Sequence, residues 1–275
     1  MMLRTAFWIV AALSVAGTAG AQTAEVAPPF VTTPPEVVER MLALAETRGD
    51  DVVMDLGSGD GRIVIAAAKQ YGARGIGVEL DPKLVAAARE NAQAAGVAQQ
   101  TRFLNGDVLK ADLSGASVVT AYLLPWLMDA LQPKFLAELA PGTRIVSHAF
   151  AMSGWEPDAT REFPLSGEHA GRTATLYFWV VPAEVRGEWY AAQPEGEWRL
   201  EIRQNFQQIE VEGAVGDVPL RTSGAVLRGT HIGWQGEGEG EGGTGRFEGR
   251  VLTFQIVGTL TANGASRSIV FARRP

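Results

Sequence analysis

Residues 51–62 read DVVMDLGSGDGR, an apolar segment that runs into a glycine-rich loop. The run from Asp51 to Leu56 is typical of a strand that is buried on both faces. The glycines that follow permit a tight turn and let a ligand approach the backbone closely. A helix is predicted from Ile63 to about Tyr71, with its N-terminus at the loop. The segment therefore predicts the first strand, loop and helix of a ligand-binding α/β sheet.

The spacing of the glycines indicates which ligand this loop suits. Loops that bind dinucleotides follow G-x-G-x-x-G and place a pyrophosphate at the helix N-terminus. Here the third glycine comes one residue earlier, and Asp55 and Asp60 place two carboxylates beside the turn. Carboxylates attract a cation and repel a pyrophosphate. S-adenosylmethionine (SAM), which carries a sulfonium, an ammonium and no phosphate, fits such a loop.

Two further acids follow the next two predicted strands. Glu79 ends the strand that starts at Gly75, and it lies about 20 residues after the first glycine, the spacing of a carboxylate that binds ribose hydroxyls. Asp107 follows a strand over Thr101 to Asn105. The carboxyl ends of parallel strands share one sheet edge, where ligands of open α/β sheets bind. The three strands thus predict an acidic SAM site along that edge.

The rest of the first 182 residues continues the alternation of strands and helices. Further helices are predicted at 35–44, 82–95 and 126–139, and further strands at 118–122, 143–148 and 173–181. Proline in the first turn and glycine after the last turn support the helix limits. Alternating strands and helices predict a doubly wound, mostly parallel, Rossmann-like α/β sheet.

After Pro182 the pattern changes to a period of two residues. Apolar residues alternate with polar ones around Leu200 and again over 252–256, and Asn263-Gly264 is a hairpin turn signal. We expect a small all-β domain, a β-meander of about six strands or a small barrel, with Trp189, Trp198 and Trp234 in its core. The glycine- and glutamate-rich residues 236–243 are expected to form a solvated loop. The predicted organisation is 1–21 signal peptide, 22–182 α/β domain and 183–275 β-domain.

Several segments resemble class I SAM-dependent methyltransferases. They are DLGSGDGRIV at 55–64, VELDP at 78–82, VVTAYLLP at 118–125 and RIVSH at 144–148. Together with FVTTP at 30–34, they are similar to the branch of mitochondrial protein-lysine N-methyltransferases that act on the adenine nucleotide translocase and the ATP synthase c-subunit. The resemblance covers about Pro29 to Val181 and implies N-methylation of a protein lysine.

The loop, the strand ends and the resemblance together give the candidate site residues. The cofactor-binding residues are Thr33, Asp55, Gly57, Ser58, Gly59, Asp60, Gly61, Glu79 and Asp107. Tyr122 and His148 are the candidate catalytic residues, and Pro125 and Trp126 are candidates for contact with the acceptor. No metal is expected, because methyl transfer is a direct displacement that depends on positioning.

The sequence leaves the methyl acceptor open. A protein lysine and a small molecule fit the acidic loop equally well, and an exported, catalytically silent binding protein is a third alternative. The net charge of −7 and the pI near 5.1 argue against nucleic acid as the partner. The partner of the β-domain cannot be read from the sequence.

The N-terminus has the pattern of a secretory signal peptide. Arg4 precedes an apolar run from Ala6 to Ala16, and Ala19-Gly20-Ala21 is a small-residue cleavage site. We therefore expect a periplasmic or secreted protein, with membrane association through an uncleaved N-terminal segment as the alternative. Export conflicts with a cofactor that is made in the cytoplasm.

Overall fold

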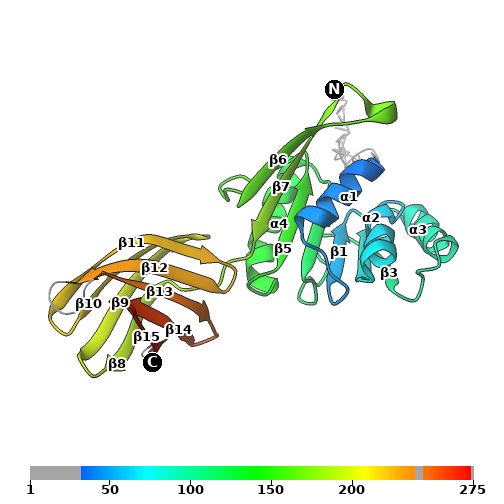
Figure 1. The fold of residues 1–275 in the computed structure, drawn as a ribbon. Coiled ribbons are helices and arrows are strands. Elements are labelled where there is room, and N and C mark those ends of the chain that lie inside the picture. Colours follow the sequence, from blue (N-terminus) through cyan, green and yellow to red (C-terminus); the bar gives the residue numbers. More distant parts are fainter. Residues whose placement is uncertain (1–31, 239–243, 274–275) are drawn as a thin grey trace, which may run out of the picture. The chain divides into compact units, whose positions relative to one another are not determined.

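The computed structural model describes residues 32–238 and 244–273. A seven-stranded sheet has the strand order β3-β2-β1-β4-β5-β7-β6 (Figure 1). Its strands are β1 Val52–Leu56, β2 Arg74–Glu79, β3 Thr101–Asn105, β4 Val118–Ala121, β5 Arg144–His148, β6 Ala159–Pro164 and β7 Thr173–Val180. The first five strands are parallel, and β7 runs antiparallel to both β5 and β6. The predicted doubly wound, mostly parallel sheet is confirmed.

Within the described residues, four helices cover the two faces of this sheet. They are α1 Pro35–Leu44, α2 Arg62–Ala66, which continues as a π-helical turn over Ala67–Tyr71, α3 Pro82–Ala94 and α4 Pro125–Glu138. Residues of α1 and α2 share a core with Val53 of β1, whereas residues of α4 share a core with Met54 and Leu56. Alternate residues of β1 therefore point to opposite helical layers, which explains the unbroken apolar pattern of this strand.

The edge strand β6 was missed by the sequence analysis. Of its six residues only Phe163 is buried, so the strand lacks the apolar alternation that marks a half-buried strand. In the part of the chain that the structure describes, it pairs with β7 alone.

The β-domain is a closed, eight-stranded antiparallel barrel, two strands more than predicted. Its strands are β8 Gly187–Gln193, β9 Gly196–Asn205, β10 Gln208–Val215, β11 Val218–Arg228, β12 His231–Gly238, β13 Thr244–Val251, β14 Gln255–Ala262 and β15 Ala265–Ala272 (Figure 1). The tryptophans Trp189, Trp198 and Trp234 are all buried in its core, as predicted. Eight strands give a barrel whose interior is filled by side chains.

Two local predictions in the β-domain were wrong and one was right. Leu252 and Phe254 do not lie in a strand: they are exposed in the turn between β13 and β14, so their alternation had no buried face behind it. Residues 236–238 belong to β12, while 239–243 lie outside the described residues. Asn263 and Gly264 form the turn between β14 and β15, both with positive φ.

The described residues form one unit by their contacts. At one of these contacts the Phe206 ring stacks on Trp155 with centroids 5.3 Å apart, and Trp155 Nε1 donates a hydrogen bond to Gln207 Oε1 at 2.9 Å. The predicted signal peptide lies outside the described residues. Among the described residues, no helix is both long and apolar enough to cross a membrane.

Candidate functional site

The glycine loop joins β1 to α2 at the carboxyl edge of the sheet. The backbone N–H groups of Gly57 and Ser58 donate to the carbonyl oxygen of Val78 on β2, at 2.9 and 3.0 Å. Gly57, Gly59 and Gly61 all have positive φ, which side chains disfavour. A Cβ on Gly57 would lie 2.8 Å from the Leu123 side chain. The positive φ and this contact both favour glycine at 57 before any ligand is considered.

Gly61 is constrained in the same way. Its Cβ would lie 2.7 Å from the Phe103 ring of β3 and 2.9 Å from Ala88 of α3. From the sequence, the three glycines were expected to permit a tight turn and to give clearance for the ligand. For Gly57 and Gly61 the structure gives a different reason, which is close packing of the loop against neighbouring side chains.

Glu79 ties the end of β2 to this loop. Its Oε2 accepts a hydrogen bond from the Gly59 N–H at 2.9 Å, and its Oε1 accepts from the Asp81 N–H, also at 2.9 Å. Asn105 of β3 donates to the carbonyl oxygens of Glu79 and Leu80 at 3.0 and 2.8 Å. The carboxylate is therefore held in place beside the loop.

Asp55 is the buried acid of the site, at 3% exposure. Its Oδ1 accepts a hydrogen bond from Thr120 Oγ1 at 2.7 Å. Burial is the main cause that raises the pKa of Asp55 to about 7; the hydrogen bond from Thr120 acts against this rise, and the negative charges of Glu79 and Asp60 add to it. Among the described residues, no cation pairs with it. A bound cation would stabilise the ionised form, so the site fits the ammonium and sulfonium groups of SAM.

Asp60, by contrast, is already neutralised. Arg62 Nη2 lies 2.6 Å from Asp60 Oδ2, and Arg62 Nη1 donates to the carbonyl oxygen of Thr33 at 2.9 Å. Burial acts to raise the pKa of Asp60, but the hydrogen bonds and charge of Arg62 keep it below its ordinary value. The structure thus joins two predicted cofactor residues, Thr33 and Asp60, through an arginine that the sequence analysis did not include in the site.

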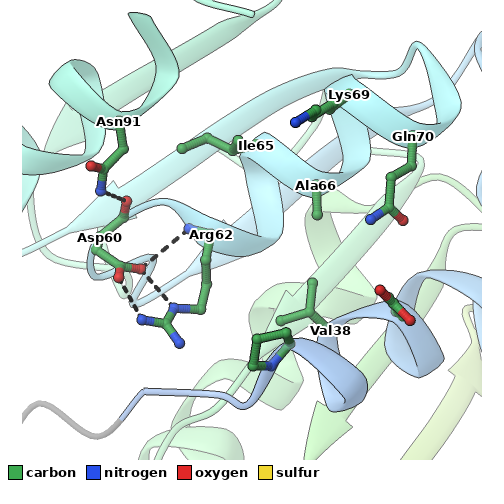
Figure 2. Close-up of a pocket in the computed structure, with 10 residues that line it drawn as sticks. Val38, Asp60, Arg62, Ile65, Ala66, Lys69, Gln70 and Asn91 are labelled. Atoms are coloured by element: carbon green, nitrogen blue, oxygen red, sulfur yellow. Dashed lines mark hydrogen bonds and ion pairs between the residues drawn. The ribbon is translucent and has the colours of Figure 1, made fainter. Parts of the chain in front are cut away.

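A groove of about 450 Å³ is lined in part by this ion pair. Figure 2 shows Val38 of α1 facing Ala66 of α2 across it, with Asp60, Arg62 and Asn91 at one end. Asn91 Nδ2 donates to the carbonyl oxygen of Asp60 at 3.0 Å. Asp60 is the one predicted cofactor residue in its lining, so this groove is separate from the edge that carries Asp55 and Glu79.

The two remaining cofactor candidates are Ser58 and Asp107. Ser58 Oγ is buried and has no hydrogen-bond partner among the described residues. Asp107 Oδ1 accepts from the Leu109 N–H at 2.9 Å, and its Oδ2 lies 3.7 Å from Lys110 Nζ. Asp107 thus orders the loop after β3 at the same sheet edge as Glu79.

Aromatic residues follow the next two strands along this edge. Tyr122 comes directly after β4, and its ring centroid lies 4.2 Å from that of His148, the last residue of β5. His148 is buried, its Nδ1 has no hydrogen-bond partner among the described residues, and burial, helped by the charge of Arg172, lowers its pKa to about 4. The imidazole is therefore neutral at pH 7. Pro125 and Trp126 begin α4 beside Tyr122, and Trp126 is 55% exposed.

Comparisons with known proteins agree with this geometry. Residues 55–159 match the family model of the ANTKMT methyltransferase domain. A protein-lysine N-methyltransferase from Saccharolobus islandicus (strain REY15A) is 40% identical over 154 residues, which cover 56% of this chain and 93% of that protein. This chain belongs to the same methyltransferase family as that protein. It is a SAM-dependent methyltransferase, and SAM is its cofactor.

Two other relatives extend this comparison. The methyltransferase is 51% identical to an RNA methyltransferase from Salinibacter ruber, whose crystal structure contains S-adenosyl-L-homocysteine; the match has a TM-score of 0.51 and covers 56% of this chain and 96% of that one. The mouse adenine nucleotide translocase lysine N-methyltransferase is 40% identical over 132 residues. That match covers 48% of this chain and 57% of the mouse protein.

Proposed function

We propose that this enzyme methylates the side-chain nitrogen of a lysine in a protein. The observation that carries the proposal is the 40% identity to a protein-lysine N-methyltransferase over 93% of that protein's length. In this chain Asp55 and Glu79 form an acidic edge beside aromatic residues that suit an amine. When bound, SAM supplies a methyl group that the lysine nitrogen takes in a direct displacement.

Residues at one half of the sheet edge bind SAM, and residues at the other half bind the acceptor. Asp55 and Glu79 bind the charged and hydroxyl groups of SAM, while Tyr122 orients the incoming amine. His148 packs against the Tyr122 ring and is neutral, so it adds no positive charge that would repel a protonated lysine. A lysine must lose its proton before it reacts, and a partly desolvated site lowers the pKa of an amine.

The experiment is incubation of the purified enzyme with isotope-labelled SAM and protein extract from the native host. Mass spectrometry of labelled bands should locate the methyl group on lysine. Glu79→Ala enzyme, which retains the acceptor residues, is the matched control and should give little labelling. Label on other side chains, or on small molecules alone, would contradict the proposal.

RNA is the second candidate acceptor, because the Salinibacter ruber relative is an RNA methyltransferase. The net charge of −7 opposes binding to a phosphate backbone. Addition of ribonuclease to the same incubation separates the two candidates, since it should leave protein labelling unchanged and abolish any RNA labelling.

We also propose that residues 1–21 direct export and that the mature chain begins at Gln22. The charged start, the short apolar run and Ala19-Gly20-Ala21 support this proposal. Membrane association through an uncleaved segment is the alternative. N-terminal mass spectrometry of fractionated native cells tests both, because an intact Met1 in the cytoplasm would contradict export and remove the conflict over SAM supply.

A further inference from the structure

The chain makes an unusually tight turn directly after β5. The Phe150 N–H donates to the carbonyl oxygen of His148 at 2.9 Å, and Ala149 between them has a φ of 68°. This is a γ-turn with positive φ at its central residue, a rare and strained form. For alanine such a φ costs free energy, and residues held in this way cluster at functional sites.

Neighbouring residues hold the turn in this conformation. Ser147 Oγ donates to the carbonyl oxygen of Phe150 at 2.6 Å, and the Ala149 N–H donates to the carbonyl oxygen of Thr175 on β7 at 2.8 Å. Bonds on both sides of Ala149 thus compensate for its strain. The position of Phe150 is therefore fixed by the strand ends rather than by a free loop.

The turn places the ring of Phe150 near the ring of Tyr122. The Phe150 and Tyr122 rings lie with centroids 6.3 Å apart and planes inclined by 20°. Both residues are half-buried. The next residue, Leu123, packs where a Cβ of Gly57 would lie. The glycine loop therefore contacts the residue that follows Tyr122.

We propose that Tyr122 and Phe150 form a two-ring site that binds the methylated ammonium group of the acceptor lysine. This inference rests on the proposed function and adds Phe150 as a specificity-determining residue. A methylammonium spreads its positive charge over its methyl groups and is attracted to the negative faces of aromatic rings. Such a site keeps a partly methylated lysine bound, so the enzyme favours di- and trimethylated products.

Binding without turnover tests the proposal. The probe is N-acetyl-Nε-trimethyl-lysine amide, titrated by calorimetry into full-length enzyme saturated with S-adenosyl-L-homocysteine. Its neutral tert-butyl isostere has the same shape and no charge. We expect the charged probe to bind and the isostere to bind at least about threefold more weakly, the lower range of a cation–π contact.

Variants at Phe150 show whether probe binding depends on an aromatic ring or only on a side chain that fills the space. Phe150→Leu should weaken binding of the charged probe by about 3- to 30-fold, whereas Phe150→Tyr should retain it. Phe163→Leu is the matched control, because it makes the same substitution on β6, where the ring contacts Arg40. It should leave probe binding unchanged. Equal binding of probe and isostere, failure of the probe to bind, or an unaffected Phe150→Leu variant would each overturn the proposal.

A product assay keeps this inference distinct from the proposed function. If lysine is methylated, Phe150→Leu should shift the products from tri- toward monomethyl-lysine without changing SAM affinity. If no protein lysine is methylated although the probe binds as expected, the proposed acceptor is wrong and the ring site remains. If lysine is methylated but the probe results fail, only the ring site is wrong.

Discussion

Glu79 Oε2 accepts a hydrogen bond from the backbone N–H of Gly59 at 2.9 Å, which joins the end of β2 to the glycine loop after β1. The same carboxylate accepts a second bond from the Asp81 N–H, one residue before α3 begins. One side chain thus aligns the loop, the second strand and the next helix.

Replacement of Glu79 by alanine should weaken SAM binding by about 1.5–3 kcal/mol, the range for hydrogen bonds to a charged group. Calorimetric titration of SAM measures this loss. Glu79→Gln is the control, because its amide oxygen still accepts from the Gly59 N–H while the charge is lost. Its affinity for SAM should lie between those of the native enzyme and Glu79→Ala. A folded Glu79→Ala variant with unchanged affinity would remove Glu79 from the cofactor site.

SAM affinity should rise with pH between about 6 and 8. Without ligand the pKa of Asp55 is about 7, so this carboxyl is partly protonated at neutral pH. A cationic ligand favours the ionised form, and each pH unit below the pKa therefore costs up to about tenfold in affinity. Calorimetry at several pH values should show this rise in the native enzyme. Asp55→Asn should bind weakly with a flat profile; a flat profile in the native enzyme would contradict the coupling.

The same pKa predicts how the stability of the SAM-free enzyme depends on pH. The folded pKa of Asp55 lies above its unfolded value of 3.8, so the folded state binds the extra proton. Its contribution to stability is therefore complete below about pH 3.8 and is lost as pH rises through 7. Denaturant unfolding of native and Asp55→Asn enzyme isolates this contribution as the difference between their pH profiles.

The sequence predicted the strands that carry the cofactor site because their apolar runs end in recognisable residues. It missed β6 because an exposed edge strand needs no apolar alternation, and it missed Phe150 because the γ-turn at Ala149 has no glycine to mark it. The partner of Asp60 was also missed. Asp60 and Arg62 are two residues apart, but a sequence cannot show whether an acid faces a ligand or its own neighbour.

Alanine substitutions at two glycines should differ in cost. Gly72 has a φ of 72° and open space around its Cβ position, so Gly72→Ala should cost only the left-handed backbone strain, about 1–2 kcal/mol. Gly61→Ala adds overlap with the Phe103 ring and should cost about 1–3 kcal/mol more. Urea unfolding measures both. Equal losses would show that the loop moves to accept a side chain.

A chain that ends at Pro182 should fold and bind SAM with unchanged affinity. The sheet is complete at Val180, and none of the predicted cofactor residues lies in the barrel. In addition, two relatives each match 56% of this chain, and these matches cover 93% and 96% of the relatives. Each of those proteins is therefore little longer than its matched region.

The shortened chain should nevertheless be less stable. Trp155 is 1% exposed in the full chain, and removal of the barrel takes away the stacked Phe206 ring and the hydrogen bond to Gln207. Phe206→Ala in the full chain removes the same ring contact, worth about 0.5–1.5 kcal/mol beyond its buried area, and should lower the melting temperature in the same direction. Calorimetric melting with and without SAM compares the two proteins. If the shortened chain is unfolded while Phe206→Ala melts like the native enzyme, then the sheet depends on the barrel through contacts other than Trp155, and the boundary at Pro182 is wrong.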